Sequence, residues 1–176
     1  MRSSLRLEKA IKNCRACSFV DKPFVTYGAY RKWLPEKVRV LAVGESPPPG
    51  RKRSFFYNLA QFDRLRLSMR LITGKREEEL LRWLKRRGIF ITAAVKCRPP
   101  KPSDITSMRK KCERWLRMEI ELLRPERIVA MGRTAVRSLC TVLGLREPDS
   151  VRDLVEVEKR GYSCLLYTSP SPRDRG

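Results

Sequence analysis

Four cysteines are the residues whose type and spacing most clearly indicate chemistry. Cys14 and Cys17 are separated by two residues in the stretch NCRAC, and Cys97 and Cys112 flank a proline-rich basic loop. A C-x2-C spacing lets two thiolates bind one centre from a single turn, and a loop followed by a helical turn can bring the second pair beside it. Four thiolates suit either tetrahedral zinc or a 4Fe–4S cluster, and the spacing alone leaves both open. Scattered buried thiols are the simpler alternative, which the C-x2-C pair disfavours.

The elements that must position these cysteines follow an alternating pattern. Apolar runs predict strands over 37–46, 89–95, 127–132 and, as the candidate fourth, 154–159. Helical spacing of apolar residues predicts helices over 4–14, 56–72, 77–88, 105–123 and 133–144, with Ser103 or Asp104 as the cap of the long one. Strands that alternate with helices predict an α/β fold: a three-layer αβα sandwich with a central four-stranded parallel sheet.

Three turns fall where predicted strands end, and ligands bind at that edge of such sheets. They are GESPPPG after the first strand, KCRPP after the second and MGRT after the third. The sequence therefore predicts one site built from these turns.

The charge of the chain indicates its partner. Its 176 residues carry 40 Lys and Arg against 19 Asp and Glu, a formal net charge of +21. Such an excess attracts polyanions, of which DNA and RNA are the commonest inside cells. From charge alone we expect phosphate contacts at four residues of the loop and helix around the second cysteine pair: Arg98, Lys101, Arg109 and Lys110. A basic but merely solvated surface is the alternative.

The amino-terminal sequence and the apolar runs bear on location. No apolar run reaches the roughly 20 residues that a transmembrane helix needs, and MRSSLRLEKAIKNC has no apolar segment like that of a signal peptide. We therefore expect a cytoplasmic protein that does not enter a membrane and keeps its cysteines reduced, which favours metal binding over disulfides.

The order of these motifs resembles a known family. The C-x2-C pair is followed by VLAVGESPP, by FITAAVKCRPP and by C-x2-WL-x2-EI-x2-LRPERIVAMGRTA, across residues 14–138. This resembles the iron–sulfur uracil-DNA glycosylases of bacteria and archaea, families 4 and 5. The resemblance implies a monomeric prokaryotic enzyme of base-excision repair, which flips a deaminated base such as uracil out of DNA and hydrolyses its N-glycosidic bond. It also implies a 4Fe–4S cluster, with zinc as the alternative, on Cys14, Cys17, Cys97 and Cys112.

The resemblance also assigns roles in the active site. Gly44-Glu45-Ser46-Pro47-Pro48 is similar to the family's first motif, Gly-Glu-x-Pro-Gly, so Glu45 is the catalytic candidate. A carboxylate there can orient water and stabilise the positive charge that develops on the sugar. In RSFFYN, Phe56 aligns best with the aromatic that stacks on the flipped base, with Phe55 close behind. The alternative for Glu45 is a carboxylate that only stabilises a turn, and the alternative for the phenylalanines is packing in the core.

Two departures from the family pattern concern the base-binding residues. Family 4 ends its second strand with Ile-Thr-Asn, whereas this chain has Ile91-Thr92-Ala93, and alanine offers no side-chain hydrogen bond. Ala93 therefore puts uracil specificity in doubt. The family's second motif, His-Pro-Ser, has no counterpart, because the sequence contains no His. These departures keep a second reading open, a non-catalytic iron–sulfur or zinc module that binds nucleic acid.

The last residues of the chain, 164–176, do not look like part of the natural protein. CLLYTSPSPRD matches the translation of a transposon adapter used in preparing sequencing libraries. We therefore expect residues 1–163 to be a single glycosylase-like domain, incomplete at its C-terminus, and residues 164–176 to be adapter read-through. On this view the missing His motif lies beyond Ser163, and the 176-residue chain is inactive. A genuine Ser/Pro-rich tail is the alternative.

Overall fold

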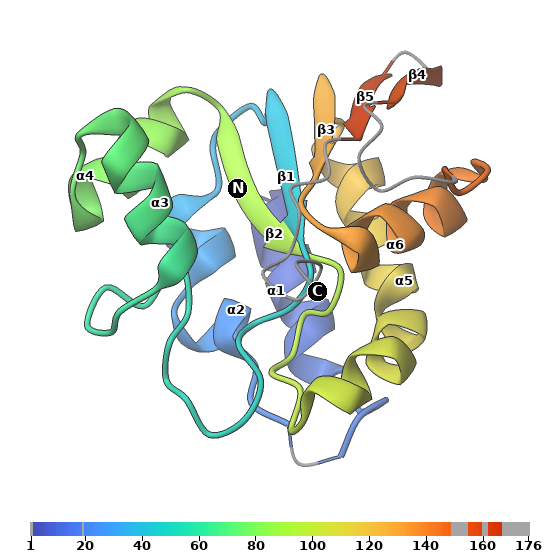
Figure 1. The fold of residues 1–176 in the computed structure, drawn as a ribbon, viewed down its shortest axis with the longest axis horizontal. Coiled ribbons are helices and arrows are strands. Elements are labelled where there is room, and N and C mark those ends of the chain that lie inside the picture. Colours follow the sequence, from blue (N-terminus) through green and yellow to red (C-terminus); the bar gives the residue numbers. More distant parts are fainter. Residues whose placement is uncertain (1, 19, 149–154, 160–161, 167–176) are drawn as a thin grey trace, which may run out of the picture.

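The computed structural model describes residues 2–18, 20–148, 155–159 and 162–166. Its strands form one sheet in the order β2-β1-β3-β5-β4 (Figure 1). The bounds are β1 Val40–Gly44, β2 Ile89–Ala93, β3 Arg127–Ala130, β4 Val155–Lys159 and β5 Tyr162–Leu166. β2, β1, β3 and β5 run parallel to their neighbours, and β4 pairs antiparallel with β5 at the edge.

The sheet confirms the predicted α/β class and corrects the identity of its last strands. The predicted fourth strand forms β4, but it lies antiparallel at the edge rather than continuing the parallel order. The fourth parallel strand is β5, in which Cys164 and Leu165 pair with β3 residues. An open strand edge can pair with a short added segment, so this pairing leaves the domain boundary at residue 163 a prediction. Residues 167–176 of the expected read-through lie outside the described residues.

β1 lies between β2 and β3 and is apolar on both faces. Leu41, Ala42 and Val43 are all buried, and Ala42 pairs with Ile91 of β2 on one side and Val129 of β3 on the other. A strand covered on both faces reads as a continuous apolar run, which is why the sequence pattern found it.

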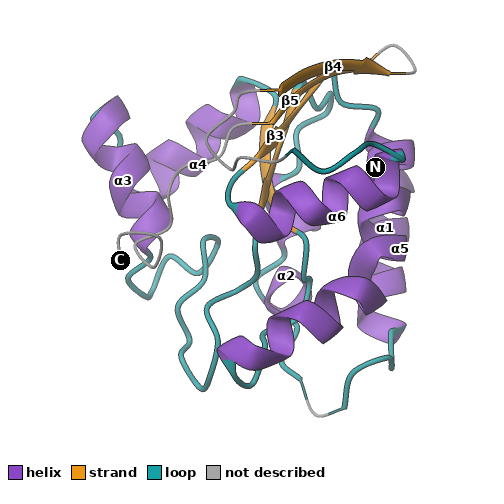
Figure 2. Ribbon diagram, turned by 45° about the vertical axis from the view of Figure 1, so that its right-hand side comes forward, coloured by secondary structure: helices purple, strands orange, loops and turns teal. Residues whose placement is uncertain are grey.

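Helices cover both sides of the sheet. With the sheet nearly edge-on, α3 and α4 lie on one side, and α1, α5 and α6 lie on the other (Figure 2). The helix bounds are α1 Arg2–Asn13, α2 Pro23–Thr26, α3 Arg64–Thr73, α4 Glu77–Arg86, α5 Ile105–Leu123 and α6 Arg133–Leu143; short helical turns cover Ala29–Trp33 and Pro102–Asp104. No helix in the described part of the chain is long and apolar enough to cross a membrane.

The helix predicted over 56–72 begins later than expected. α3 starts at Arg64, because Asp63 is extended and its side chain accepts a hydrogen bond from the Arg66 backbone N–H, which caps the helix. Upstream, Asn58 bonds its side chain to the carbonyl of Arg53 and the N–H of Ala60, which holds a turn. The apolar residues of 56–62 therefore belong to a loop.

The long helix confirms its predicted buried face. Its buried apolar and cysteine residues recur at helical spacing: Ile105, Met108, Cys112, Leu116 and Ile120. The helix ends at Leu123, where Arg124 takes a left-handed conformation with φ of 44°, directly before Pro125. Asp104 does not cap it with its side chain, which instead accepts a hydrogen bond from the Lys101 backbone N–H.

Candidate active site

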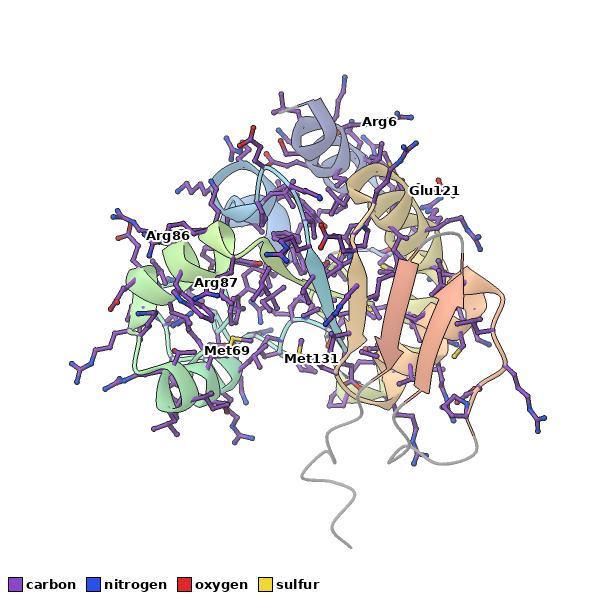
Figure 3. The ribbon with its side chains drawn as sticks, turned by 90° about the horizontal axis from the view of Figure 1, so that it is seen from above. Arg6, Met69, Arg86, Arg87, Glu121 and Met131 are labelled. Carbon is purple, nitrogen blue, oxygen red and sulfur yellow. The ribbon has the colours of Figure 1, made fainter. Side chains whose placement is uncertain are left out.

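A pocket lies at the carboxyl ends of β1 and β2, where the sequence predicted the site. Its volume is about 300 Å³. Its walls come from the ends of the two strands, from the loop between β1 and α3, and from Phe24 and Met131. The predicted residues that line it are Gly44, Glu45, Phe55, Phe56 and Ala93. Met131 comes from the turn after β3 and is labelled beside the sheet in Figure 3.

Glu45 is held in place by a hydrogen bond from α6. Its Oε2 accepts a hydrogen bond of 2.6 Å from the Thr134 hydroxyl, and Thr134 lies in the first turn of α6. The N-terminus of a helix stabilises a nearby carboxylate anion. Glu45 is exposed and lines the pocket, so its free oxygen can reach water or a ligand. Thr134 was not singled out, although the MGRT turn that carries it was expected at this edge.

The two phenylalanines have different surroundings. Phe55 packs against the rings of Phe24, Tyr27 and Tyr57 at centroid distances of 4.9, 5.8 and 5.8 Å. Phe56 makes one such ring contact among the described residues, an edge-on contact of 5.0 Å with Tyr57. Phe55 thus packs among three aromatic rings, whereas Phe56 contacts one; both are buried and both line the pocket.

The structure corrects the expectation for Arg98. Its side chain is only 4% exposed. Nε donates to the Asp21 carboxylate at 3.0 Å, and Nη1 donates to the carbonyls of Pro48 at 2.7 Å and Ser54 at 3.0 Å. Nη2 is buried and has no partner among the described residues. Arg98 is therefore an internal link between the two loops that frame the pocket, and not an exposed group facing phosphates.

The other predicted phosphate contacts lie at or near the surface. Lys101 and Lys110 are exposed, while Arg109 pairs with Glu113 at 2.5 Å along α5. A further basic run, residues 51–53, is also exposed and lies within the loop between β1 and α3, directly before Ser54 and the aromatic residues of the pocket. Arg6 and Arg86 point outward from α1 and α4, which shows that positive charge is spread widely over the surface (Figure 3).

The four predicted cysteine ligands line one small cavity, of about 10 Å³, between the N-terminal segment and α5. Cys97 and Cys112 are buried, and Cys14 and Cys17 are partly so. In the described part of the chain, no three His, Cys, Asp or Glu side chains are arranged to hold a metal ion. The chemistry of the donor set nevertheless fits a thiophilic metal, because four thiols line the same cavity.

The electrostatics of this cavity favour neutral thiols at its buried side. Burial, followed by the neighbouring Cys112, raises the pKa of Cys97 to about 12. Burial also raises the pKa of Cys112, against the opposing effects of the backbone N–H and the charge of Lys96. The pKa of Cys14 is lowered overall. Burial raises it, but hydrogen bonds from the Ala16 backbone, Trp115 and Arg114 together outweigh that effect. A bound cation favours the thiolate form, so it would reverse the balance at Cys97 and Cys112.

Comparison with known proteins defines the family. The family model for the uracil DNA glycosylase superfamily matches residues 31–176. The chain belongs to this superfamily.

The similar curated proteins are glycosylases of two types. The chain is 33% identical over 153 residues to a type-4 uracil-DNA glycosylase of Pyrobaculum aerophilum, covering 80% of this chain and 66% of the relative. It is 28% identical over 178 residues to the type-4 enzyme of Archaeoglobus fulgidus, covering 93% and 78%. The match to a type-5 uracil-DNA glycosylase of Pyrobaculum aerophilum is 43% identical over 58 residues, 33% of this chain and 26% of that relative. The chain thus spans about a quarter of the type-5 relative and about two thirds of the first type-4 relative.

Proposed function

We propose that the protein is a DNA glycosylase of base-excision repair, which removes uracil or a related deaminated base by hydrolysis of its N-glycosidic bond. The observation that carries this proposal is the convergence of Glu45, Phe56 and Ala93 on one pocket at the carboxyl ends of β1 and β2. Family membership and the relatives named above support the same reaction class. The residues from 1 to 163 would act as one domain and as a monomer.

Glu45 is the catalytic residue of the proposal. Departure of the base builds positive charge on the sugar, as in other glycoside hydrolyses, and a carboxylate stabilises that charge or orients the attacking water. The bond from Thr134 occupies one carboxylate oxygen and fixes the group's direction. The leaving base also needs a hydrogen-bond donor, worth a factor of about a hundred or more in comparable sites. The sequence contains no His, so this hydrogen-bond donor would have to be a group other than an imidazole.

Phe56 and Ala93 would bind the flipped base. An aromatic face gains roughly 1–3 kcal/mol by stacking on a base. Ala93 gives its part of the pocket wall no side-chain donor or acceptor, so base edges would be read there by backbone groups and by shape, with polar contacts coming from other lining residues such as Ser46. We therefore propose a wider range of deaminated bases than uracil alone.

The cysteine centre would be structural. Cys14, Cys17, Cys97 and Cys112 would hold a 4Fe–4S cluster, with zinc as the alternative, and the group would supply a covalent anchor between the N-terminal segment and the loop after β2. Lys101, Arg109 and Lys110 lie along that loop and the start of α5. They would contact DNA phosphates there.

A binding experiment tests the proposal without requiring turnover. A DNA oligonucleotide carrying 2′-fluorinated deoxyuridine, which resists hydrolysis, is compared with the same sequence carrying thymine. The proposal predicts tighter binding of the fluorinated strand, and Phe56→Ala should weaken that preference about 5- to 150-fold. Phe62→Ala is the matched control, because Phe62 lies on the same loop, is 64% exposed and does not line the pocket.

Equal affinity for both strands would favour the second candidate, a module that binds nucleic acid without catalysis. The lack of any His and the presence of Ala93 are the observations that keep that candidate in view.

A further inference from the structure

The loop between β1 and α3, residues 45–63, forms much of the pocket wall although it contains neither helix nor strand. Its Phe55, Phe56 and Tyr57 are all buried, so the carbonyls beside them are screened from water. Buried backbone carbonyls need hydrogen-bond partners, and turn bonds supply them only in part: the Asn58 N–H donates to the Phe55 carbonyl and the Gln61 N–H to the Asn58 carbonyl. The partners identify what gives the loop its shape.

One buried side chain, Arg66 of α3, bonds to four carbonyls of this loop. Its Nη1 donates to the carbonyls of Phe55 at 3.2 Å, Phe56 at 2.8 Å and Asn58 at 3.2 Å. Its Nη2 donates to the carbonyl of Gln61. The side chain of Arg66 is 4% exposed, so these bonds form away from solvent.

Arg66 is itself fixed from two directions. Its Nε donates to the Glu77 carboxylate of α4 at 2.9 Å, and its backbone N–H donates to Asp63 Oδ1 at 2.9 Å. The guanidinium is a rigid planar fork, so anchoring one edge sets the direction of the other nitrogens. Arg66 therefore links the loop to α3 and, through Glu77, to α4.

We propose that Arg66 is a positioning residue for the base pocket. By holding the carbonyls of Phe55 and Phe56, it sets the depth and tilt of the Phe56 ring, and hence the width of the slot that receives a base. The inference rests on the proposed function, since it makes Arg66 a determinant of selectivity for the flipped base. Lysine cannot replace it, because one ammonium group cannot reach four carbonyls arranged around a planar fork.

The chain offers a matched control on the same helix. Arg70 is the same residue type one helical turn further on and is partly buried. Its side chain makes no hydrogen bond or ion pair with any residue that the structure describes. Arg66→Lys, Arg66→Met and Arg70→Met are therefore compared in the full chain.

Hydrogen exchange measured by mass spectrometry tests the loop directly. In both Arg66 variants, amides of residues 55–62 should exchange about tenfold faster or more, while those of β1 stay as in the wild type. Arg70→Met should leave both segments unchanged. If the amides of residues 55–62 in Arg66→Lys exchanged as slowly as in the wild type, the proposal would be overturned. That result would show that a positive charge alone, without the planar guanidinium, is enough to hold the loop.

Selective binding separates positioning from a loss of folded protein. The readout is the ratio of affinities for 2′-fluorodeoxyuridine DNA and the matched thymine DNA. The Arg66 variants should lower this ratio about fivefold or more, with affinity for thymine DNA unchanged. A purely structural role would weaken both affinities in parallel and preserve the ratio, which would refute the proposal. A wild-type ratio of one refutes the proposed function, whereas a wild-type preference that Arg66→Lys retains refutes the role of Arg66 alone.

Discussion

Replacing Lys96 should destabilise the protein severely, because Lys96 and Glu119 form an ion pair inside the fold. The two side chains are 1% and 0% exposed, and Lys96 Nζ lies 2.5 Å from Glu119 Oε2. Thr92 Oγ1 donates to Glu119 Oε1 at 2.8 Å, and so does the Tyr30 hydroxyl at the same distance. Burial and then Glu119 raise the pKa of Tyr30 well above its usual value, so Tyr30 remains a neutral donor. Both carboxylate oxygens of Glu119 thus have partners, and among the described residues Lys96 is the cation that pairs with it.

The size of the effect follows from this geometry. Lys96→Met keeps the length of the side chain and leaves Glu119 as a buried charge without its cation, which costs roughly 3–5 kcal/mol in comparable pairs. Glu119→Gln leaves the opposite charge unpaired and should cost a similar amount. The double variant has no buried charge, so its cost should fall below the sum of the two by at least about 1 kcal/mol.

Urea unfolding followed by circular dichroism measures these free energies. With a slope of about 2 kcal/mol/M, a loss of 3–5 kcal/mol moves the midpoint down by roughly 1.5–2.5 M. Metal content is measured on the same samples, because Lys96 neighbours Cys97 and its charge also acts on Cys112. Losses below about 1 kcal/mol in both single variants would refute the reasoning, since they would mean that water reaches the pair.

Two further predictions concern the cysteine centre and the DNA surface. Cys97→Ala should abolish metal binding and lower stability, because metal binding is coupled to folding in such sites. The control variant Cys140→Ala should retain the metal. Elemental analysis and visible absorption distinguish a brown iron–sulfur protein from a colourless zinc protein. The outcome against this would be full metal content in Cys97→Ala. DNA affinity should fall steeply with salt, and the Lys101→Ala/Lys110→Ala variant should reduce the log–log slope by about 2; an unchanged slope would place the phosphate contacts elsewhere.

The strands and the cysteine cavity could be predicted because local patterns determine them. β1 to β3 are short, mostly apolar runs, and such runs are typical of parallel strands that are covered on both faces. The cysteines were grouped by spacing, and the structure brings Cys14, Cys17, Cys97 and Cys112 to one cavity. The edge strand β4 could not be oriented from sequence, since direction depends on which neighbour it pairs with.

The loop of the pocket could not be predicted, because distant side chains determine its shape. Residues 56–62 carry apolar side chains at nearly helical spacing, but the cap at Asp63, the side-chain bonds of Asn58 and the bonds from Arg66 hold them as a loop. Arg98 was expected at the surface because arginines usually are exposed, yet it bonds to carbonyls more than 40 residues away in sequence. Both errors concern buried arginines that satisfy loop carbonyls, a role that has no local sequence signal.

The central claim is that Glu45 serves the removal of a deaminated base, and release of the base from DNA tests it most directly. Because residues 164–176 are predicted to be adapter read-through, two chains are compared: the 176-residue chain, and a chain in which the genomic residues that follow Ser163 replace 164–176. Each is incubated in excess over DNA carrying uracil, hypoxanthine or xanthine, and abasic sites are cleaved with alkali. We predict release by the replaced chain, about a hundredfold slower release with Glu45→Gln, and little or none by the 176-residue chain. Failure of both chains on all three bases, or full activity in Glu45→Gln, would contradict the account.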